Sequence, residues 1–559
     1  MDKRLWFSAA TAAVGAGLMV ATAVAAPTKA SAPLKAGKAT AGGTIVTELS
    51  TDVDYTDPQL TYYQPMWELE YATACKLMNY PDAEAPQGGQ IQPEVAAGLP
   101  VISKDGKTYT FTIKPGYKFN TGEAVTALSF KRAIDRLTDP KLASSTSFLV
   151  SDIVVGAQAR LDGKASSVSG VVASGNKLTF KLTHPAPDLL ARLSTPPLQA
   201  IDSKLATNED PQGVNNAASC GPYYISARTP NRSITIKRNP NYKGPRPHKI
   251  DAIQVNVGNT PEVIFQNVTK GTTDYAEDGV DPSEYAGIAQ KYGINKKQFF
   301  TRPELEVDYL ALNHLPGRLF ANNPSLAKAV NYAVDRHAYT AQRGFLAGNR
   351  TNRILPPGMA GVTKKTEILK GGYPIAVDNS TLSKAKSLAT GHTADGKGLM
   401  WAPNRGPGPL QAQIVQYDLK QLGIDLQIKL LPRAQQFTDA RVKANADYDI
   451  NWSAWGADYN DPFDFINILL DGSSIADTAN NNDAYYSNAA FTNQMHKAAL
   501  LFGEQRDAAY DQLDKAMMSQ DPPWTPILNR LNRLFVSSHF GCFLYNPVFE
   551  VDFAAACRT

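Results

Sequence analysis

The sequence has few cysteines and no concentration of charge of either sign. Its 559 residues include four cysteines, and the formal net charge is only +4. Lysines and arginines are scattered along the chain, so we expect no nucleic-acid partner, which would need a basic face with interleaved aromatic residues. Hydrophobic residues make up 43% and charged residues 19%. This composition is typical of a globular protein large enough for several cores.

Long hydrophobic runs are missing from the chain after its first residues. Residues 1–25 are typical of an export signal, because Lys3 and Arg4 precede an apolar run and residues 23–25 fit a small-x-small cleavage site. An uncleaved membrane anchor is the alternative, which the glycines and alanines of the run disfavour. No cysteine precedes Cys75, so we expect no lipid-modified cysteine after the signal. The protein is predicted to be exported to the periplasm or cell surface.

The four cysteines lie at positions 75, 220, 542 and 557. An even count in an exported chain favours disulfides, and four cysteines allow three pairings. Cys542 with Cys557 would close a short terminal loop and leave Cys75 with Cys220, which is the pairing we favour. No CxxC or Cys-His spacing predicts a metal site, and no cofactor is expected.

Catalytic motifs are also missing. The sequence contains neither HExxH nor a GxSxG elbow. Its seven histidines lie far apart along the chain. We therefore do not expect an enzyme.

What the chain does contain is an alternation of strand and helix patterns. Residues 26–42 are rich in Pro, Ala and Lys and predict a flexible tether. The order of the later segments favours βαβ units and mixed or parallel sheets. The predicted segments are a strand at 42–49, a helix at 66–80, a hairpin at 105–119 turning at Pro115-Gly116, a helix at 127–137 capped by Thr126, a hairpin at 221–242, a strand at 252–258, a helix at 261–271, a helix at 324–339, and a helix then a strand at 409–432, separated by Gly423.

Five segments together resemble one family. They are PGYKFNTGEAVTALSFKRAIDR (115–136), GPYYISARTPNRSITIKRNPNYKG (221–244), LALNHLPGRLFANNPSLAKAVNYAVDR (310–336), LKQLGIDLQIKL (419–430) and YDINWSAWGADYNDPFDF (448–465). In this order they resemble motifs of the bacterial extracellular solute-binding proteins of the peptide/nickel type (family 5), which include oligopeptide- and dipeptide-binding proteins. The resemblance extends from about Gly43 to about Pro547.

The resemblance implies a fold of the α/β class, a two-lobed clamshell of the type II periplasmic-binding-protein kind with mixed sheets and an extra subdomain in the first lobe. It places the first lobe at 43–258 and 504–559 and the second lobe at 259–503. The chain would cross between lobes near Gly258-Asn259 and Gly503-Glu504. A monomer would capture its ligand between the lobes and deliver it to an ABC permease and its ATPase subunits.

The resemblance also implies site residues. Asp458 lies where peptide-binding relatives hold the ligand's terminal ammonium, and the backbone at Ala454 and Gly456 would be extended and able to add a strand to a peptide. Trp455 and Tyr459 would form the pocket walls. A structural role for Asp458, as a cap or in a salt bridge with an arginine, is the alternative.

Trp452 stands where the oligopeptide-binding relatives have an arginine, which removes a cation and adds a ring able to stack on a ligand. Arg350 and Arg353 are candidates for the missing cation that would meet a ligand carboxylate. Tyr62 and Tyr63 are expected either to face the cleft from the first lobe or to pack in the core.

A peptide or peptide-like solute is the expected ligand. A metal chelate, a sugar or another non-peptide solute remains an alternative on the same fold. So does an extracellular sensor, or a hydrolase on this scaffold.

Overall fold

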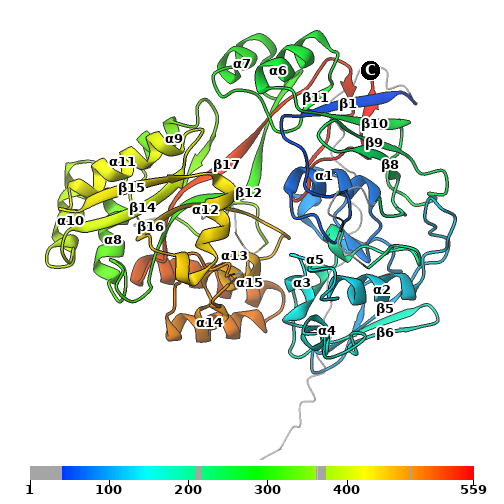
Figure 1. Cartoon of the computed structure of the whole chain (residues 1–559), viewed down its shortest axis with the longest axis horizontal. Coiled ribbons are helices and arrows are strands. Elements are labelled where there is room, and N and C mark those ends of the chain that lie inside the picture. Colours follow the sequence, from blue (N-terminus) through cyan, green and yellow to red (C-terminus); the bar gives the residue numbers. More distant parts are fainter. Residues whose placement is uncertain are drawn as a thin grey trace, which may run out of the picture.

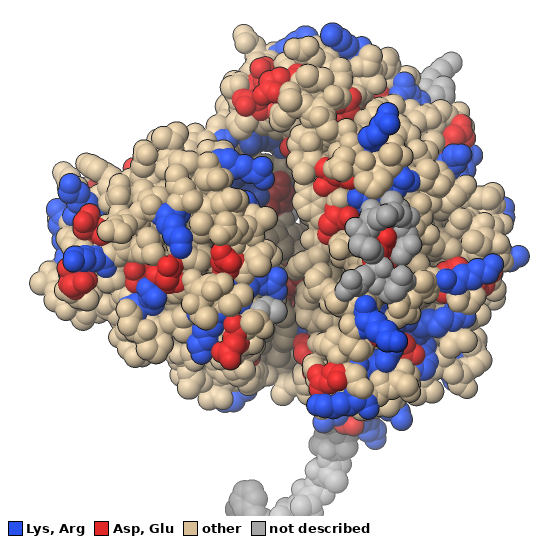
Figure 2. Space-filling view, viewed as in Figure 1, with Lys and Arg blue, Asp and Glu red and all other residues tan. Residues whose placement is uncertain are grey.

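The computed structural model describes residues 41–207, 210, 213, 216–360, 362, 373–478 and 480–559. These residues form two lobes joined at one end (Figure 1). A groove runs between the lobes, and acidic side chains are visible along it (Figure 2). The predicted signal at 1–25 and nearly all of the predicted tether lie outside the described residues. Within the described part, none of the helices has the length and apolar character needed to span a bilayer.

The first lobe is built on a five-stranded mixed sheet in the order β11-β1-β10-β9-β8. β1 lies parallel to both β10 and β11, whereas β10, β9 and β8 are antiparallel neighbours. The β8–β9 hairpin and the β10 strand confirm two sequence predictions. The elements of this part are β1 (Thr44–Leu49), α1 (Gln64–Thr73), β8 (Tyr223–Thr229), β9 (Ser233–Arg238), β10 (Ala252–Val257), α6 (Pro261–Lys270), β11 (Tyr275–Ala276) and α7 (Tyr285–Tyr292).

An extra subdomain of the first lobe contains a second sheet in the order β4-β5-β7-β6. Helix α2 begins directly after Thr126, whose capping box with Ser129 confirms the predicted start of this helix. The hairpin predicted to turn at Pro115-Gly116 is wrong, because β5 pairs with β4 and with the distant β7. The elements here are β4 (Val101–Ile102), β5 (Thr108–Thr112), α2 (Ala127–Leu137), α3 (Phe148–Ser151), α4 (Ala157–Leu161), β6 (Val171–Ser174), β7 (Lys177–Lys181) and α5 (Leu189–Arg192).

The second lobe is built on a six-stranded mixed sheet in the order β13-β17-β12-β16-β14-β15. The helix predicted at 324–339 is divided into α8 and α9, since Asp335 ends one segment and caps the next by accepting hydrogen bonds from the N–H groups of His337 and Ala338. The elements of this lobe are β12 (Phe299–Leu312), α8 (Pro324–Ala333), α9 (Arg336–Ala341), β13 (Gly348–Arg350), α10 (Asn379–Ala389), β14 (Lys397–Pro403), α11 (Gly408–Lys420), β15 (Asp425–Leu431), α12 (Arg433–Ala440), β16 (Ile450–Gly456), α13 (Phe463–Leu470), α14 (Ala489–Ala499), α15 (Gly503–Gln520) and β17 (Trp524–Phe535).

The crossings between the lobes lie within two long paired strands, β12 and β17, which extend from one lobe into the other (Figure 1). Their pairing is interrupted between Pro303 and Val307. Before this break, Phe300 packs in the core of the first lobe, and after it Val307 packs in the core of the second. Crossings near Gly258-Asn259 and Gly503-Glu504 are therefore wrong. The reason is that α6 and α7 return to the first lobe beside β11, whereas α15 packs inside the second lobe.

Two disulfides join the cysteines in the favoured pairing. Cys75–Cys220 links the end of α1 to the segment before β8, and Cys542–Cys557 closes the carboxyl-terminal loop. The remaining short strands are β2 (Met78–Asn79), β3 (Gln92–Pro93), β18 (Phe540–Gly541), β19 (Tyr545–Asn546), β20 (Glu550–Val551) and β21 (Cys557–Arg558). The carboxyl-terminal strands lie on the first lobe, where their aromatic side chains share a core with β1 and β10.

Candidate functional site

A cavity of about 450 Å³ lies in the groove between the lobes. Side chains of α1 and of the segment that contains β19 and β20 line it from the first lobe. Residues of α12, of the end of β16 and of the crossing strands line it from the second. We call it the cleft cavity. A smaller niche of about 20 Å³ adjoins it, shares Arg433 and Phe437 with it, and is also lined by Ala454 and Trp455.

Strand β16 borders the cleft cavity and the niche with its backbone. It pairs over its whole length with β12, but with β14 only at Ile450 and Asn451. Within the described part of the chain, the edge of β16 beyond Asn451 therefore has no neighbouring strand on that side. The backbone is extended up to Gly456, as expected. The Trp452 carbonyl already accepts a hydrogen bond from Gln436 Nε2 at 2.9 Å, and peptide groups at an edge that lack such a partner can accept an added strand.

Asp458 follows β16 and reaches the cleft cavity with its carboxyl group. Tyr62 from the first lobe donates its hydroxyl to this carboxyl group, at 3.0 Å from Oδ1 and 2.9 Å from Oδ2. Burial raises the pKa of Asp458 to about 7, while the Tyr62 hydrogen bond and the charge of Arg441 oppose that rise. The carboxylate thus lacks full solvation, and its contact with Tyr62 joins the two lobes.

Asp464 shapes the loop that carries Asp458. Its Oδ2 accepts hydrogen bonds from the Asp458 backbone N–H at 3.0 Å and from Trp455 Nε1 at 3.2 Å. Asp464 has no exposed surface. Two acids of one motif therefore differ: Asp464 holds the loop through its Oδ2, whereas Asp458 lines the cavity.

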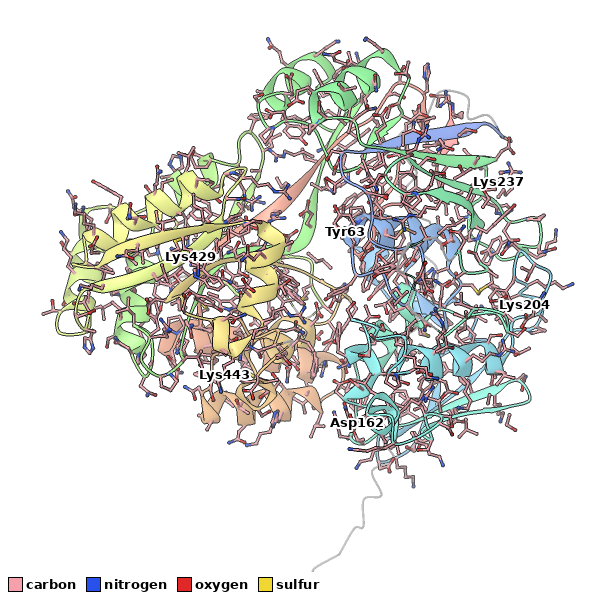
Figure 3. All side chains as sticks on the ribbon, in the orientation of Figure 1. Tyr63, Asp162, Lys204, Lys237, Lys429 and Lys443 are labelled. Carbon is pink, nitrogen blue, oxygen red and sulfur yellow. A yellow bond between two sulfur atoms is a disulfide. The ribbon has the colours of Figure 1, made fainter. Side chains whose placement is uncertain are left out.

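The two tyrosines of the first lobe face the cleft, which is one of the two positions expected from the sequence. Tyr62 and Tyr63 both line the cleft cavity, and Figure 3 shows Tyr63 on the side of the first lobe that faces the second. Trp455 lines only the niche, and its indole is held by Asp464.

The structure does not place the other two predicted aromatic residues in the cavity wall. Tyr459 packs in the core of the extra subdomain, 3.3 Å from Asp188 through its hydroxyl group. Trp452 donates to Gln411 from its indole nitrogen at 2.9 Å and lies beneath the guanidinium of Arg433, 5.0 Å from Cζ to the ring centre. Stacking of Trp452 on a ligand is therefore a wrong prediction, because helix α12 covers that ring.

Arg353 is likewise in the wrong place for a ligand contact. It is buried, with Nε 2.8 Å from Asp514 and Nη2 2.8 Å from Asp511. Arg350 lies on β13 at the edge of the sheet and is not among the residues lining the cleft cavity.

Arg433 is a cation in the cavity wall that the sequence reasoning did not name. It begins α12, lines both the cleft cavity and the niche, and forms no ion pair among the described residues. Burial and the nearby Arg530 lower the pKa of Arg433. The only local signal was its place after a strand and a proline, which did not point to the cleft. No group of three or more potential metal ligands occurs in the described residues.

A two-lobed fold with a cavity between the lobes defines a binding protein of the clamshell class. Residues 90–477 match the model of the bacterial extracellular solute-binding proteins, family 5. This match covers more than half of the sequence, and the chain belongs to that family.

Named relatives support this membership. The chain is 26% identical over 440 residues to the oligopeptide-binding protein OppA of Bacillus subtilis, covering 76% of this chain and 77% of the relative. It is 22% identical to the probable D,D-dipeptide-binding periplasmic protein DdpA of Escherichia coli, covering 90% and 92%. Among solved structures, the clavulanic acid biosynthesis oligopeptide binding protein 2 matches with a TM-score of 0.83 and 20% identity, covering 94% and 97%.

Proposed function

We propose that this protein is the exported receptor of an ABC importer and captures a peptide between its two lobes. The observation that carries the proposal is the open edge of β16, which ends at the cavity-facing carboxylate of Asp458. A peptide is the solute that offers both an extended backbone for the edge and a terminal ammonium for the carboxylate.

Arg433 supplies the opposite charge for such a ligand. It lies over the ring of Trp452, the residue that replaces an arginine found in oligopeptide-binding relatives. The guanidinium is thereby positioned at the junction of the cleft cavity and the niche. We infer that Arg433, rather than Arg353, meets the ligand's carboxylate.

Export and partnership with a membrane permease belong to the same proposal. Residues 1–25 have the pattern of an export signal, and the relative DdpA is named a periplasmic protein. The role needs no catalytic step: closure of the lobes on the solute presents the loaded form to the permease. Two lobes joined by two paired strands provide the hinge that such closure needs.

The deciding experiment identifies what the protein carries. Mass spectrometry of the ligand released from protein purified without denaturation should find peptides. Titration calorimetry with a tripeptide and with its carboxyl-amidated form should then show that Arg433→Met weakens binding of the free acid by about tenfold or more and leaves the amide unaffected. Arg350→Met is the matched control and should bind both forms as the wild type does.

A non-peptide solute is the second candidate. The chain is 24% identical to a probable deoxycholate-binding periplasmic protein, YgiS of Escherichia coli, over 82% of this chain. Aromatic side chains in the cleft wall, including Trp67, Tyr71 and Phe549, offer a surface for rings. Recovery of a steroid or another non-peptide molecule by mass spectrometry, together with peptides that fail to bind, would overturn the peptide proposal.

A further inference from the structure

Carboxyl groups outnumber cations in the wall of the cleft cavity. Glu304 and Glu306 of β12, Glu550 of β20 and Glu68 of α1 line it in addition to Asp458. Arg530 also lines it, but its charge is already matched within the protein. Its Nη1 lies 2.5 Å from Glu306, and its Nη2 lies 2.8 Å from Asp308.

Glu304 and Glu550 are two of the four acids of this wall that form no ion pair in the described part of the chain, and Glu68 and Asp458 are the others. Glu550 accepts hydrogen bonds only from neutral amides, those of Gln64 and Asn532. Glu304 forms no ion pair among the described residues. Burial and then the charge of Glu306 raise the pKa of Glu304 well above its ordinary value. Burial raises the pKa of Glu550 to about 7. This part of the cavity wall therefore has a surplus of acidic side chains.

A buried hydroxyl group beside these acids is the second observation that points to a ligand. Tyr545 lines the same cavity and is only 2% exposed, and its Oη forms no hydrogen bond of normal geometry in the described part of the chain, although the side chain of Asn532 is close enough to act on its pKa. The charges of Glu550 and Glu304 both act on this tyrosine and help to raise its pKa, after the larger effect of burial. A buried polar atom without a partner costs free energy unless a ligand or water meets it.

The pKa of the acids near Tyr545 and the pKa of Asp458 respond to different neighbours. Apart from burial, the pKa of Asp458 responds to Tyr62 and Arg441. The pKa of Glu304 responds instead to Glu306, Glu550 and Arg530. The cavity wall therefore carries more carboxyl groups than one ligand ammonium can match.

We propose that the cleft selects peptides that carry a basic side chain, and that Glu304 and Glu550 receive this second positive charge. This inference rests on the proposed function, because it assumes that a peptide occupies the cleft with its terminal ammonium at Asp458. A lysine ammonium brings three donors and an arginine guanidinium five. Either group converts the mutual repulsion of the two acids into charge-assisted hydrogen bonds.

The test compares lysine with norleucine, which has nearly the same shape but no charge. Titration calorimetry would use trialanine peptides with one substitution at each position in turn. For at least one position we expect the wild type to prefer lysine by about tenfold to a hundredfold. Glu304→Gln and Glu550→Gln should each reduce that ratio severalfold. Glu262→Gln, at an exposed position on α6, is the matched control and should leave it unchanged.

Each outcome decides between the two proposals. If lysine and norleucine peptides bind equally at all positions and Asp458→Ala still abolishes binding, the basic side-chain inference is overturned and the proposed function stands. If no peptide binds the folded wild type, the proposed function fails. A lysine preference that survives both glutamine substitutions would also overturn the assignment to Glu304 and Glu550. The wild-type comparison needs no substitution, so it decides even if a variant does not fold.

Discussion

Arg353 and Arg433 both belong to the second lobe, but one lies in its interior and the other at the cleft. Arg353 is enclosed and paired with Asp511 and Asp514. Arg433 has no carboxylate partner in the described part of the chain and lines the cleft cavity. The same contrast separates Asp464, which the loop engages, from Asp458, which the cavity exposes. A charge that the chain already satisfies stabilises the fold, whereas one that faces a cavity without an ionic partner is available to a ligand.

Removal of the interior arginine should have the largest effect on stability. Arg353→Met leaves Asp514 buried without its ionic partner, and loss of one half of a buried pair costs about 3–5 kcal/mol. Denaturant unfolding should show this loss in the free energy of unfolding, while peptide affinity of the remaining folded protein stays close to that of the wild type.

The control for Arg353→Met is Lys164→Met. Lys164 pairs with Asp162 at the surface, so we expect a change below about 1 kcal/mol. If Arg353→Met were fully stable but failed to bind peptides, the comparison between interior and cleft would be wrong.

Removal of the cleft carboxylate should show the opposite pattern. Asp458→Ala should weaken binding of a peptide with a free terminal ammonium by about a hundredfold to several thousandfold, which corresponds to about 3–5 kcal/mol. The free energy of unfolding should change little, because the lost hydrogen bond to Tyr62 is offset by relief of a poorly solvated charge. Titration calorimetry and denaturant unfolding measure the two effects.

An N-acetylated peptide is the internal control for Asp458→Ala. It should bind the wild type weakly and lose little more in the variant. Asp162→Ala, at a position that does not line the cleft cavity (Figure 3), should bind every peptide as the wild type does. Equal affinity of wild type and Asp458→Ala for the free peptide would return Asp458 to a structural role.

The pH dependence of binding follows from the same carboxylate. The pKa of Asp458 is raised to about 7 by burial, and an ammonium binds the ionised form. Affinity for trialanine should therefore fall as pH decreases from 7 to 5, by up to about a hundredfold. Asp458→Asn should remove most of this dependence.

The free energy of unfolding of the ligand-free protein should change with pH in the direction opposite to that of peptide affinity. A raised pKa means that protonated Asp458 favours the folded state, so its contribution is complete below the ordinary pKa of aspartate and is lost as pH rises through about 7. Relative to the wild type, Asp458→Asn should therefore gain stability between pH 5 and pH 8. An unchanged difference over that interval would contradict the raised pKa.

The sequence allowed the fold to be predicted, and it led to some of the residues that line the cleft cavity, for different physical reasons. Periodic apolar patterns and caps are local, so the helices at 127–137 and 261–270 and the β8–β9 hairpin followed from them. The order of motifs led to Asp458, which lines the cleft cavity, and its role in ligand binding stays a prediction. The crossings at β12 and β17 were missed because a strand that serves both lobes has no break in its own pattern.

Partners distant in sequence were also missed. Arg353 is paired with residues about 160 positions later, as its separations of 158 and 161 show. Arg433 reaches the cavity only because α12 lies over Trp452. The residues around Arg353 and Arg433 in the sequence indicate neither of these arrangements, because an arginine with ionic partners and one without them have the same local sequence pattern. An arginine of the interior can be distinguished from an arginine of the cleft only by its contacts in the folded structure.

Removal of the hydrogen bond between Tyr62 and Asp458 should have the smallest effect. This change tests whether the protein's own residues help to hold the two lobes together without ligand. Tyr62→Phe removes one hydrogen bond across the lobes, worth about 0.5–1.5 kcal/mol. Without ligand, solution scattering should show a larger radius of gyration than for the wild type. With saturating peptide the two radii should agree, because a ligand that touches both lobes binds the closed form more tightly and so stabilises it.

Tyr63→Phe is the matched control, since Tyr63 lines the same cavity but donates no hydrogen bond to the second lobe among the described residues. Equal radii for ligand-free Tyr62→Phe and wild type would show that this hydrogen bond does not hold the lobes, and the contacts of Tyr459 and Asn460 with the first lobe would then be the ones that do.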